Sequence, residues 1–148
     1  HNTTVATIHN HPNGTPPSGI DFLNTAKWVS ENNVYSTTYV YTTSGNYALY
    51  IEDVQKAELF YSKYSGCLSD TETKMFKAES DLDKKWESIY NKLKGLSDTD
   101  RHMMSLAELA EQTNSGIRIL KSESSSSNSF GLYYTQTIDD RIIPYNCK

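Results

Sequence analysis

The segment from Pro12 to Pro17 most restricts how this chain can fold, because three prolines and a glycine interrupt any regular structure there. The residues before it, Thr3 to Ile8, are β-branched and alternating, and they predict a strand that runs into His9-Asn10-His11. From Ser18 the apolar residues follow helical spacing as far as about Asn33. The first unit is therefore predicted to be a strand, a tight loop and a helix.

Two further strands are predicted after this helix. Tyr35 to Thr42 and Asn46 to Ile51 are rich in aromatic and β-branched residues, and Gly45 supplies the turn between them. Helical spacing then returns from Glu52 to Tyr64, and Gly66 ends it. The strand, helix, hairpin and helix together indicate one mixed module.

The rest of the chain is predicted to add helices and then strands. Apolar stripes indicate one helix over about Asp70 to Lys94 and a second over Asp98 to Gln112, packed as an antiparallel pair. Strands are predicted at Gly116 to Leu120 and within Phe130 to Tyr145, around a mobile serine-rich loop, Ser122 to Ser129.

The fold class predicted from these patterns is α+β, with an α/β/α-like arrangement. We divide the chain into a core module at residues 1–66, a helical hairpin extension at 67–113 and a β-hairpin extension at 114–148.

Charge and hydropathy exclude two classes of partner. The 148 residues carry a formal net charge of -4 without a long run of either sign, so we expect no nucleic-acid partner. No segment approaches the roughly 18 consecutive apolar residues of a membrane span, so we expect a soluble domain and no membrane partner.

Cys67 and Cys147 are the two cysteines, too few for a disulfide framework. In an exported protein they can form one bridge, whereas in a cytoplasmic protein they are two thiols. The sequence leaves both states open.

Three residues near the proline-rich loop have the chemistry of a metal site. His9 and His11 are two apart on a strand, so their imidazoles point to the same face. Asp21, in the first turn of the following helix, can add a carboxylate. Two histidines, one carboxylate and a water describe a catalytic zinc site, whereas a structural site is closed by four protein ligands. Ser18 is a candidate hydrogen-bond donor to the reacting oxyanion.

These residues resemble the signature of the JAMM or MPN-type (JAB domain) metallopeptidases, His-x-His-Pro followed by Ser-x-x-Asp. It stands here as His9-Asn10-His11-Pro12 and Ser18-Gly19-Ile20-Asp21, with an Asn-Pro-Asn-Gly style most similar to the bacterial, DNA-repair-associated branch. The resemblance covers residues 3 to 64 and implies one zinc ion per chain. It implies that His9, His11 and Asp21 are the metal ligands and that Ser18 is the catalytic donor.

Two departures from the family pattern bear on activity. Six residues separate His11 from Ser18, where the family usually has seven. The family's general base is a glutamate on a preceding strand, and residues 1–8 contain no acid. We expect an N-terminally truncated piece, in which case a free sheet edge favours a homodimer. The alternative is a degenerate member that binds metal without hydrolysis.

Other interpretations of the same residues remain open. Ser18 and Asp21 also form a helix capping box, a role that needs no metal. Glu52 and Asp53 are candidates for a substitute base, although a helix N-terminal role explains them. His102 is predicted to be a solvated or capping side chain rather than a catalytic one. The tyrosines on the strands indicate cross-strand packing, with a peptide-binding surface as the alternative.

Two functions follow from these expectations. The first is a zinc-dependent peptidase or isopeptidase acting on a peptide or protein substrate, active in the intact protein and not necessarily in this piece. The second is a non-catalytic scaffold of the same fold that binds a protein partner. The style of the motif favours a bacterial cytoplasmic protein, with an exported one as the alternative.

Overall fold

The computed structural model describes residues 6–32, 37–71, 73–122, 129–132, 134–138 and 141–145 of the chain. Its helices are α1 (Gly19–Asn32), α2 (Val54–Tyr64), a short 3-10 turn η1 (Ser65–Cys67), α3 (Asp81–Lys92) and α4 (Asp98–Gln112). Its strands are β1 (Ala6–His11), β2 (Thr37–Thr42), β3 (Gly45–Ile51), β4 (Ile117–Ser122), β5 (Phe130–Leu132), β6 (Tyr134–Ile138) and β7 (Arg141–Tyr145).

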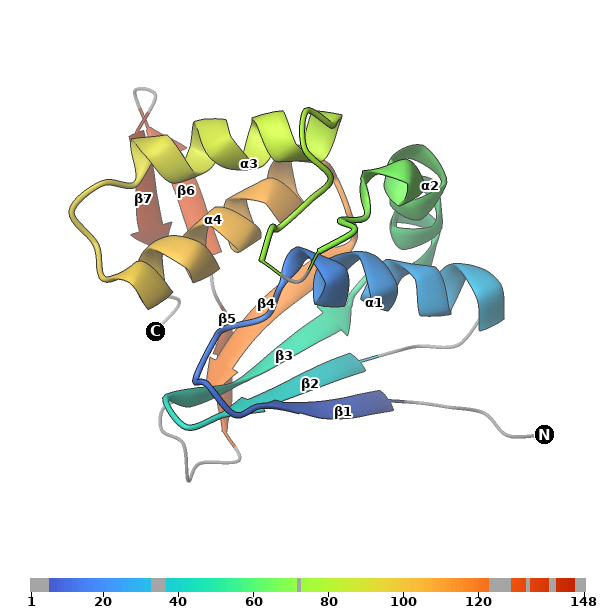
Figure 1. Ribbon diagram of the computed structural model, residues 1–148, viewed down its shortest axis with the longest axis horizontal. Coiled ribbons are helices and arrows are strands. Elements are labelled where there is room, and N and C mark those ends of the chain that lie inside the picture. The colour runs from blue at the N-terminus through green and yellow to red at the C-terminus, as the bar shows by residue number, and fades with distance from the viewer. Residues whose placement is uncertain are drawn as a thin grey trace.

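The main sheet has five strands in the order β1-β2-β3-β4-β5, and β6 and β7 form a separate hairpin (Figure 1). Strand β1 is parallel to β2, and the other neighbouring strands are antiparallel. A parallel pair needs a crossover, and α1 supplies it. The carboxyl end of β1 therefore lies at the same end of the sheet as the β2–β3 turn.

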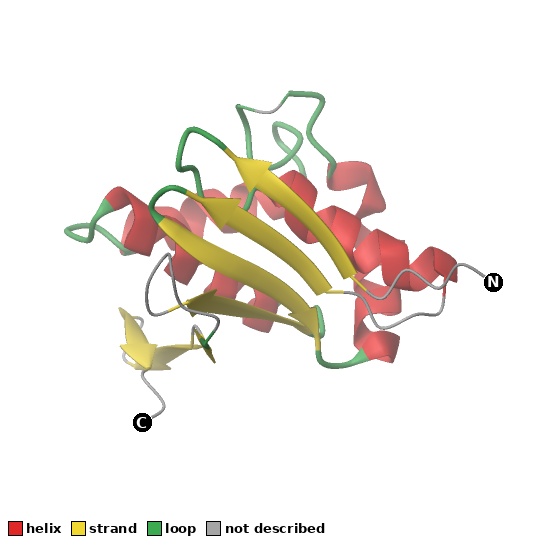
Figure 2. Cartoon of the chain, turned by 90° about the horizontal axis from the view of Figure 1, so that it is seen from below, coloured by secondary structure: helices red, strands yellow, loops and turns green. Residues whose placement is uncertain are grey.

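The helices cover one face of the sheet. In β2 the buried Thr38, Val40 and Thr42 alternate with more exposed residues, the period expected of a sheet covered on one face. The view from below shows the opposite face open, with the helices behind it (Figure 2). The α+β class is thus confirmed, whereas the described residues form two layers and not the expected α/β/α three.

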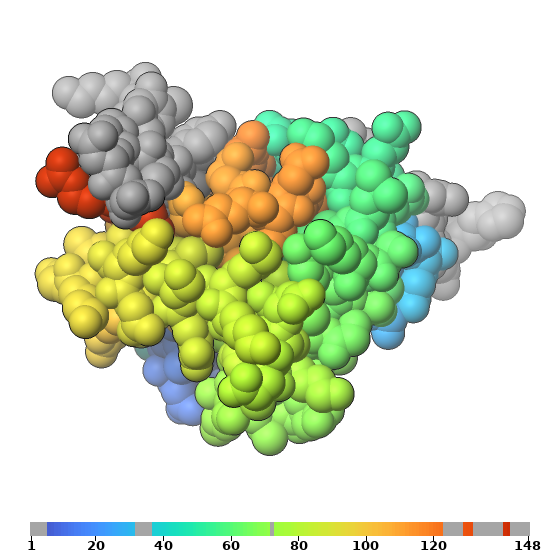
Figure 3. Space-filling view, turned by 90° about the horizontal axis from the view of Figure 1, so that it is seen from above, coloured from blue at the N-terminus to red at the C-terminus, as the bar shows by residue number. Residues whose placement is uncertain are grey.

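One hydrophobic core continues across the predicted divisions of the chain. Phe22 of α1, Leu49 of β3, Trp86 of α3 and Leu106 of α4 all belong to a single buried cluster. Viewed from the helical side, α3 and the segment before it form a continuous surface with α2 (Figure 3). Strand β4, from the segment predicted as an extension, lies beside β3 in the main sheet. The helical pair and β4 therefore contribute to the same packed unit as the first module.

The predicted helix from residue 70 was wrong in its first part. Helix α3 begins at Asp81, where the Ser80 hydroxyl accepts a hydrogen bond from the Asp83 backbone N–H at 3.3 Å. Glu79 has a φ of 63°, which no helix continues through. Apolar spacing at Met75 imitates a helical stripe, but Phe76 is the fully buried residue of this loop, at 0% exposure. The segment before Asp81 is therefore a packed loop.

Three sequence-based expectations lie outside the described residues: the strand at residues 3–5, the serine-rich loop at 123–128 and the state of Cys147. Cys67 is described and is buried. Among the described residues, no helix combines the length and apolar character needed to cross a bilayer.

Candidate metal centre

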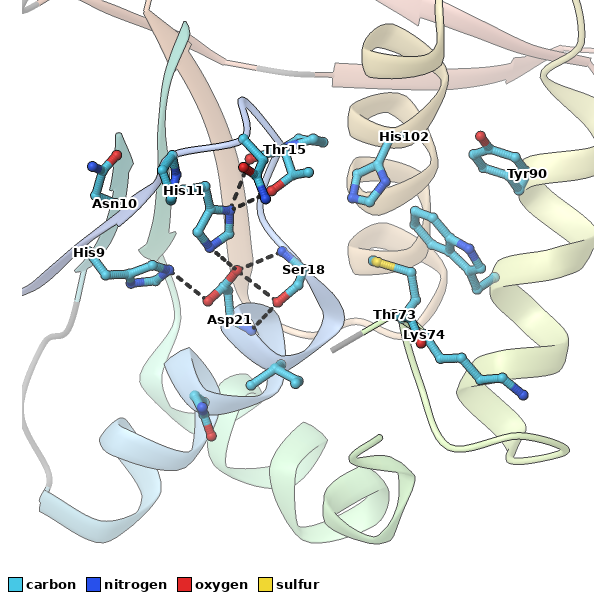
Figure 4. A pocket seen from close by; sticks show the side chains of 17 residues that line it. His9, Asn10, His11, Thr15, Ser18, Asp21, Thr73, Lys74, Tyr90 and His102 are labelled. Atoms are coloured by element: carbon cyan, nitrogen blue, oxygen red, sulfur yellow. Dashed lines mark hydrogen bonds and ion pairs between the residues drawn. The ribbon is translucent and has the colours of Figure 1, made fainter. Parts of the chain in front are cut away.

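His9 and His11 project from the carboxyl end of β1 on the side that faces the helices. Their partners in the parallel pairing, Val40 and Thr42, are buried on that side of the sheet. The two imidazole rings lie side by side, with 4.9 Å between their centroids. Both imidazole rings line the cavity shown in Figure 4. The expectation that both histidines share one face is met by this geometry.

Asp21 brings its carboxylate between the two imidazoles. Its Oδ1 lies 2.9 Å from His9 Nε2, and its Oδ2 lies 3.7 Å from His11 Nε2. One candidate ligand atom from each of the three residues lies within 4.8 Å of the other two. Asp21 is only 8% exposed, and the first turn of a helix favours a negative charge there. The three side chains can hold one metal ion and leave further coordination positions to water or substrate.

Ser18 fixes Asp21 through a reciprocal capping box. The Ser18 backbone N–H and hydroxyl donate to Asp21 Oδ2 at 2.6 and 2.8 Å, and the Asp21 N–H donates to Ser18 Oγ at 3.2 Å. Because Oδ2 already accepts two hydrogen bonds, Oδ1 is the oxygen better placed to bind a cation. The structure therefore shows Ser18 in a capping role, with its hydroxyl directed to Asp21.

The loop after β1 sets the orientation of the His11 ring. His11 Nδ1 lies 2.9 Å from the Thr15 carbonyl oxygen, which accepts a hydrogen bond when Nδ1 carries the proton. That tautomer leaves Nε2, the atom facing Asp21, with a free lone pair for a metal. Gly14, with a φ of 71°, makes the turn that returns the chain toward His11. The Ser44 hydroxyl donates a hydrogen bond to the Gly14 carbonyl oxygen at 2.9 Å, which connects this loop to the β2–β3 turn.

Three threonines join β1, β2 and α1 beneath the site. The Thr7 hydroxyl donates to Thr38 Oγ1 at 3.1 Å, and Thr38 Oγ1 lies 2.7 Å from Thr25 Oγ1. The Thr25 hydroxyl donates to the Asp21 backbone carbonyl at 2.7 Å. Since the Thr25 proton goes to Asp21, the Thr38 proton goes to Thr25. This chain fixes the first turn of α1 against the strand that carries the histidines. The three threonines were not among the predicted site residues, although a threonine on the buried face of a helix was a signal for them.

The opposite side of the cavity comes from the helical pair. The cavity has a volume of about 880 Å³, and Met75, Trp86 and His102 line it together with the three candidate ligands. His102 was expected to be solvated or capping, whereas its side chain is half-buried and hydrogen-bonded to the metal loop. Its Nε2 lies 2.7 Å from the Pro17 carbonyl oxygen, and its ring stands edge-on to Trp86 with 5.1 Å between centroids. His102 also shares helical spacing with the buried Leu106, a signal that it faces inward.

Glu52 and Asp53 do not belong to the site. Asp53 caps α2 by accepting a hydrogen bond from the Lys56 backbone N–H at 3.0 Å. Glu52 forms an ion pair with Arg118 at 2.6 Å. Both follow the end of β3 farthest from the β2–β3 turn, and neither lines the cavity. The position of Glu52 and Asp53 at the N-terminus of α2 accounts for both acidic residues. They lie at the opposite end of the sheet from the candidate ligands, which excludes them as a substitute base.

Comparison with known proteins gives no match. No family model, no curated protein and no solved structure matches this chain.

His102 is expected to make the fold more sensitive to acid. Burial lowers the pKa of His102, partly offset by its hydrogen bond to Pro17 and by the negative charge of Asp21. The unfolded chain then binds this proton more readily than the folded chain, so stability falls as pH drops through the ordinary histidine range, about 6.5. We expect metal-free His102→Gln to lose less stability than wild type between about pH 7.5 and about pH 5.

Urea denaturation of both proteins at the two pH values measures this difference. The two proteins share every other titrating group, so most of the remaining pH dependence cancels in the comparison. An equal loss of unfolding free energy in both proteins would contradict the assignment.

Proposed function

We propose that this chain binds one zinc ion through His9, His11 and Asp21 and serves a peptidase or isopeptidase that hydrolyses amide bonds. The observation that carries the proposal is that the three ligand atoms converge within 4.8 Å at the side of a cavity of about 880 Å³. Imidazole and carboxylate ligands suit zinc, and three protein ligands are typical of catalytic rather than structural sites. Cavities of this size accommodate part of a peptide.

When bound, zinc would lower the pKa of a coordinated water towards about 7 and polarise the substrate carbonyl. The residues of the chain have separate tasks. His11 is oriented by the Thr15 carbonyl, and Asp21 is held by the Ser18 backbone N–H. That N–H keeps Asp21 in place if the Ser18 hydroxyl rotates to donate to an oxyanion in the substrate. Ser18 thus combines the capping role with the proposed catalytic one.

The resemblance to the JAMM or MPN-type metallopeptidases supports the proposal. Strand, metal loop, helix and hairpin follow one another here as β1, the proline-rich loop, α1 and β2–β3. The family reaction also needs a glutamate base. Asp21 is the only carboxylate among the described residues that line the cavity, so these residues offer no general base besides this candidate ligand.

That same observation favours a second candidate, a metal-binding domain that holds a peptide or protein partner without cleaving it. A site whose described residues supply three ligands and no separate base binds a carbonyl or carboxylate but activates water poorly. General-base catalysis typically contributes about 10²- to 10⁴-fold to the rate. Whether the zinc-loaded chain hydrolyses a peptide at a measurable rate therefore separates the two candidates.

Cleavage of quenched fluorescent peptides by zinc-loaded protein tests the two functions. The first candidate predicts chelator-sensitive hydrolysis that disappears in His9→Ala. Asp53→Ala is the control, because Asp53 caps α2 and does not line the cavity. Full zinc occupancy with peptide binding and no hydrolysis would replace the first candidate with the second.

A further inference from the structure

The wall opposite the candidate ligands is formed by three residues that come together only in the folded chain. Met75 lies in the loop before α3, Trp86 lies on α3, and His102 lies near the start of α4. All three line the cavity that also contains His9, His11 and Asp21. Figure 4 shows the labelled His102 across the cavity from the ligand group. A substrate held at the metal would therefore extend toward this wall.

Two direct contacts set the position of the wall relative to the metal loop. His102 Nε2 lies 2.7 Å from the Pro17 carbonyl oxygen, one residue before Ser18. The Met75 carbonyl lies against Gly19 so closely that a Cβ at Gly19 would be 1.7 Å from its oxygen. Because one contact is at Pro17, next to the capping box, and the other is at Gly19, within it, the wall and the ligand Asp21 keep a defined separation. A wall fixed in this way can select a substrate side chain by size.

The chemistry of the wall is apolar and aromatic. Trp86 stacks on Tyr90 at 5.6 Å between centroids and meets Phe76 edge-on at 6.3 Å. His102 favours the neutral form, because burial lowers its pKa. The described lining has one carboxylate, Asp21, on the metal side, and one ammonium, Lys74, whose side chain extends away from the ligand group in Figure 4. The wall therefore offers contact area rather than charge.

We propose that Met75, Trp86 and His102 form a recognition subsite for an apolar or aromatic side chain of the peptide held at the metal. This inference rests on the proposed function, since it assumes a peptide whose carbonyl is bound by zinc. It goes further by naming the class of residue selected and the part of the chain that selects it.

Amino acid hydroxamates test the subsite without any need for catalysis, because the hydroxamate binds the metal and the side chain probes the wall. We would measure the affinities of phenylalanine, glycine and aspartate hydroxamates for the zinc-loaded chain by calorimetry. A subsite of this kind is expected to favour phenylalanine hydroxamate over glycine hydroxamate by roughly 10-fold or more. Aspartate hydroxamate is expected to bind no better than glycine hydroxamate.

Variants of the wall locate the preference. Met75→Ala and Trp86→Phe are each expected to reduce the ratio of phenylalanine to glycine affinity by about threefold or more. The glycine hydroxamate affinity should stay unchanged, which shows that the fold and the metal site are intact. Trp28→Phe is the matched control, because Trp28 lies on α1 at 40% exposure and does not line the cavity.

The possible outcomes distinguish failure of the subsite from failure of the proposed function. Failure of the wild type to bind zinc or any hydroxamate would overturn the proposed function and the subsite with it. Equal affinities for phenylalanine and glycine hydroxamates would contradict the subsite without contradicting the metal site. A preference that persists in both Met75→Ala and Trp86→Phe would likewise place recognition elsewhere.

Discussion

Asp21→Ala is expected to weaken zinc binding by at least roughly 100-fold, since even residues outside the ligand shell commonly contribute 10- to 100-fold. The variant removes the carboxylate that lies 2.9 Å from His9 Nε2 and 3.7 Å from His11 Nε2. Two imidazoles alone then face the ion, and the paired donors of Ser18 lose their acceptor. Zinc content after dialysis and calorimetric titration of the metal-free protein measure the effect.

The control is Asp53→Ala, which removes a carboxylate from the N-terminus of α2, far from the cavity. Asp53→Ala removes the helix N-terminal hydrogen bond from the Lys56 N–H, at a cost of about 1 kcal/mol in stability, so it reports what loss of a helix cap alone does to zinc binding. Asp53→Ala should retain one zinc per chain, so loss of metal in Asp21→Ala alone is attributable to coordination. Zinc binding of wild-type strength in Asp21→Ala would eliminate the proposed site.

Gly19→Ala is expected to lower the free energy of unfolding by about 2 to 3 kcal/mol, a typical cost of overpacking. The new Cβ would lie 1.7 Å from the Met75 carbonyl oxygen and 2.6 Å from its carbon, both backbone atoms. Alanine normally stabilises a helix relative to glycine, so a loss here reports the contact between α1 and the loop before α3. Thermal denaturation of the metal-free protein should show a midpoint lowered by roughly 5 to 10 °C.

Gly66→Ala is the matched control for this substitution. Gly66 lies in the 3-10 turn after α2, and nothing stands within 4 Å of the position its Cβ would take. Its stability should equal or slightly exceed that of wild type, because alanine restricts the unfolded chain. Equal midpoints for Gly19→Ala and Gly66→Ala would show that the loop does not press on α1.

Local patterns in the sequence predicted the elements around the metal loop. Runs of aromatic and β-branched residues placed β2 and β3, and helical spacing placed α1, α2 and α4, to within a few residues. The site was predictable for the same reason, since His9 and His11 must share a face on a strand and a short loop brings Asp21 back to them. These relations are local, so they depend on backbone geometry that neighbouring residues determine.

Only the tertiary structure decided what surrounds that site. Nothing near Pro17 in the sequence indicates that its carbonyl meets His102, 85 residues away, or that Met75 closes over Gly19. An apolar stripe records that a residue is buried but does not identify the residue it is buried against. The sequence by itself therefore determined the candidate ligands, His9, His11 and Asp21, and the elements that carry them. Long-range packing of α3 and α4 decided the opposite wall of the cavity, because contacts between distant segments depend on how complete elements fit together.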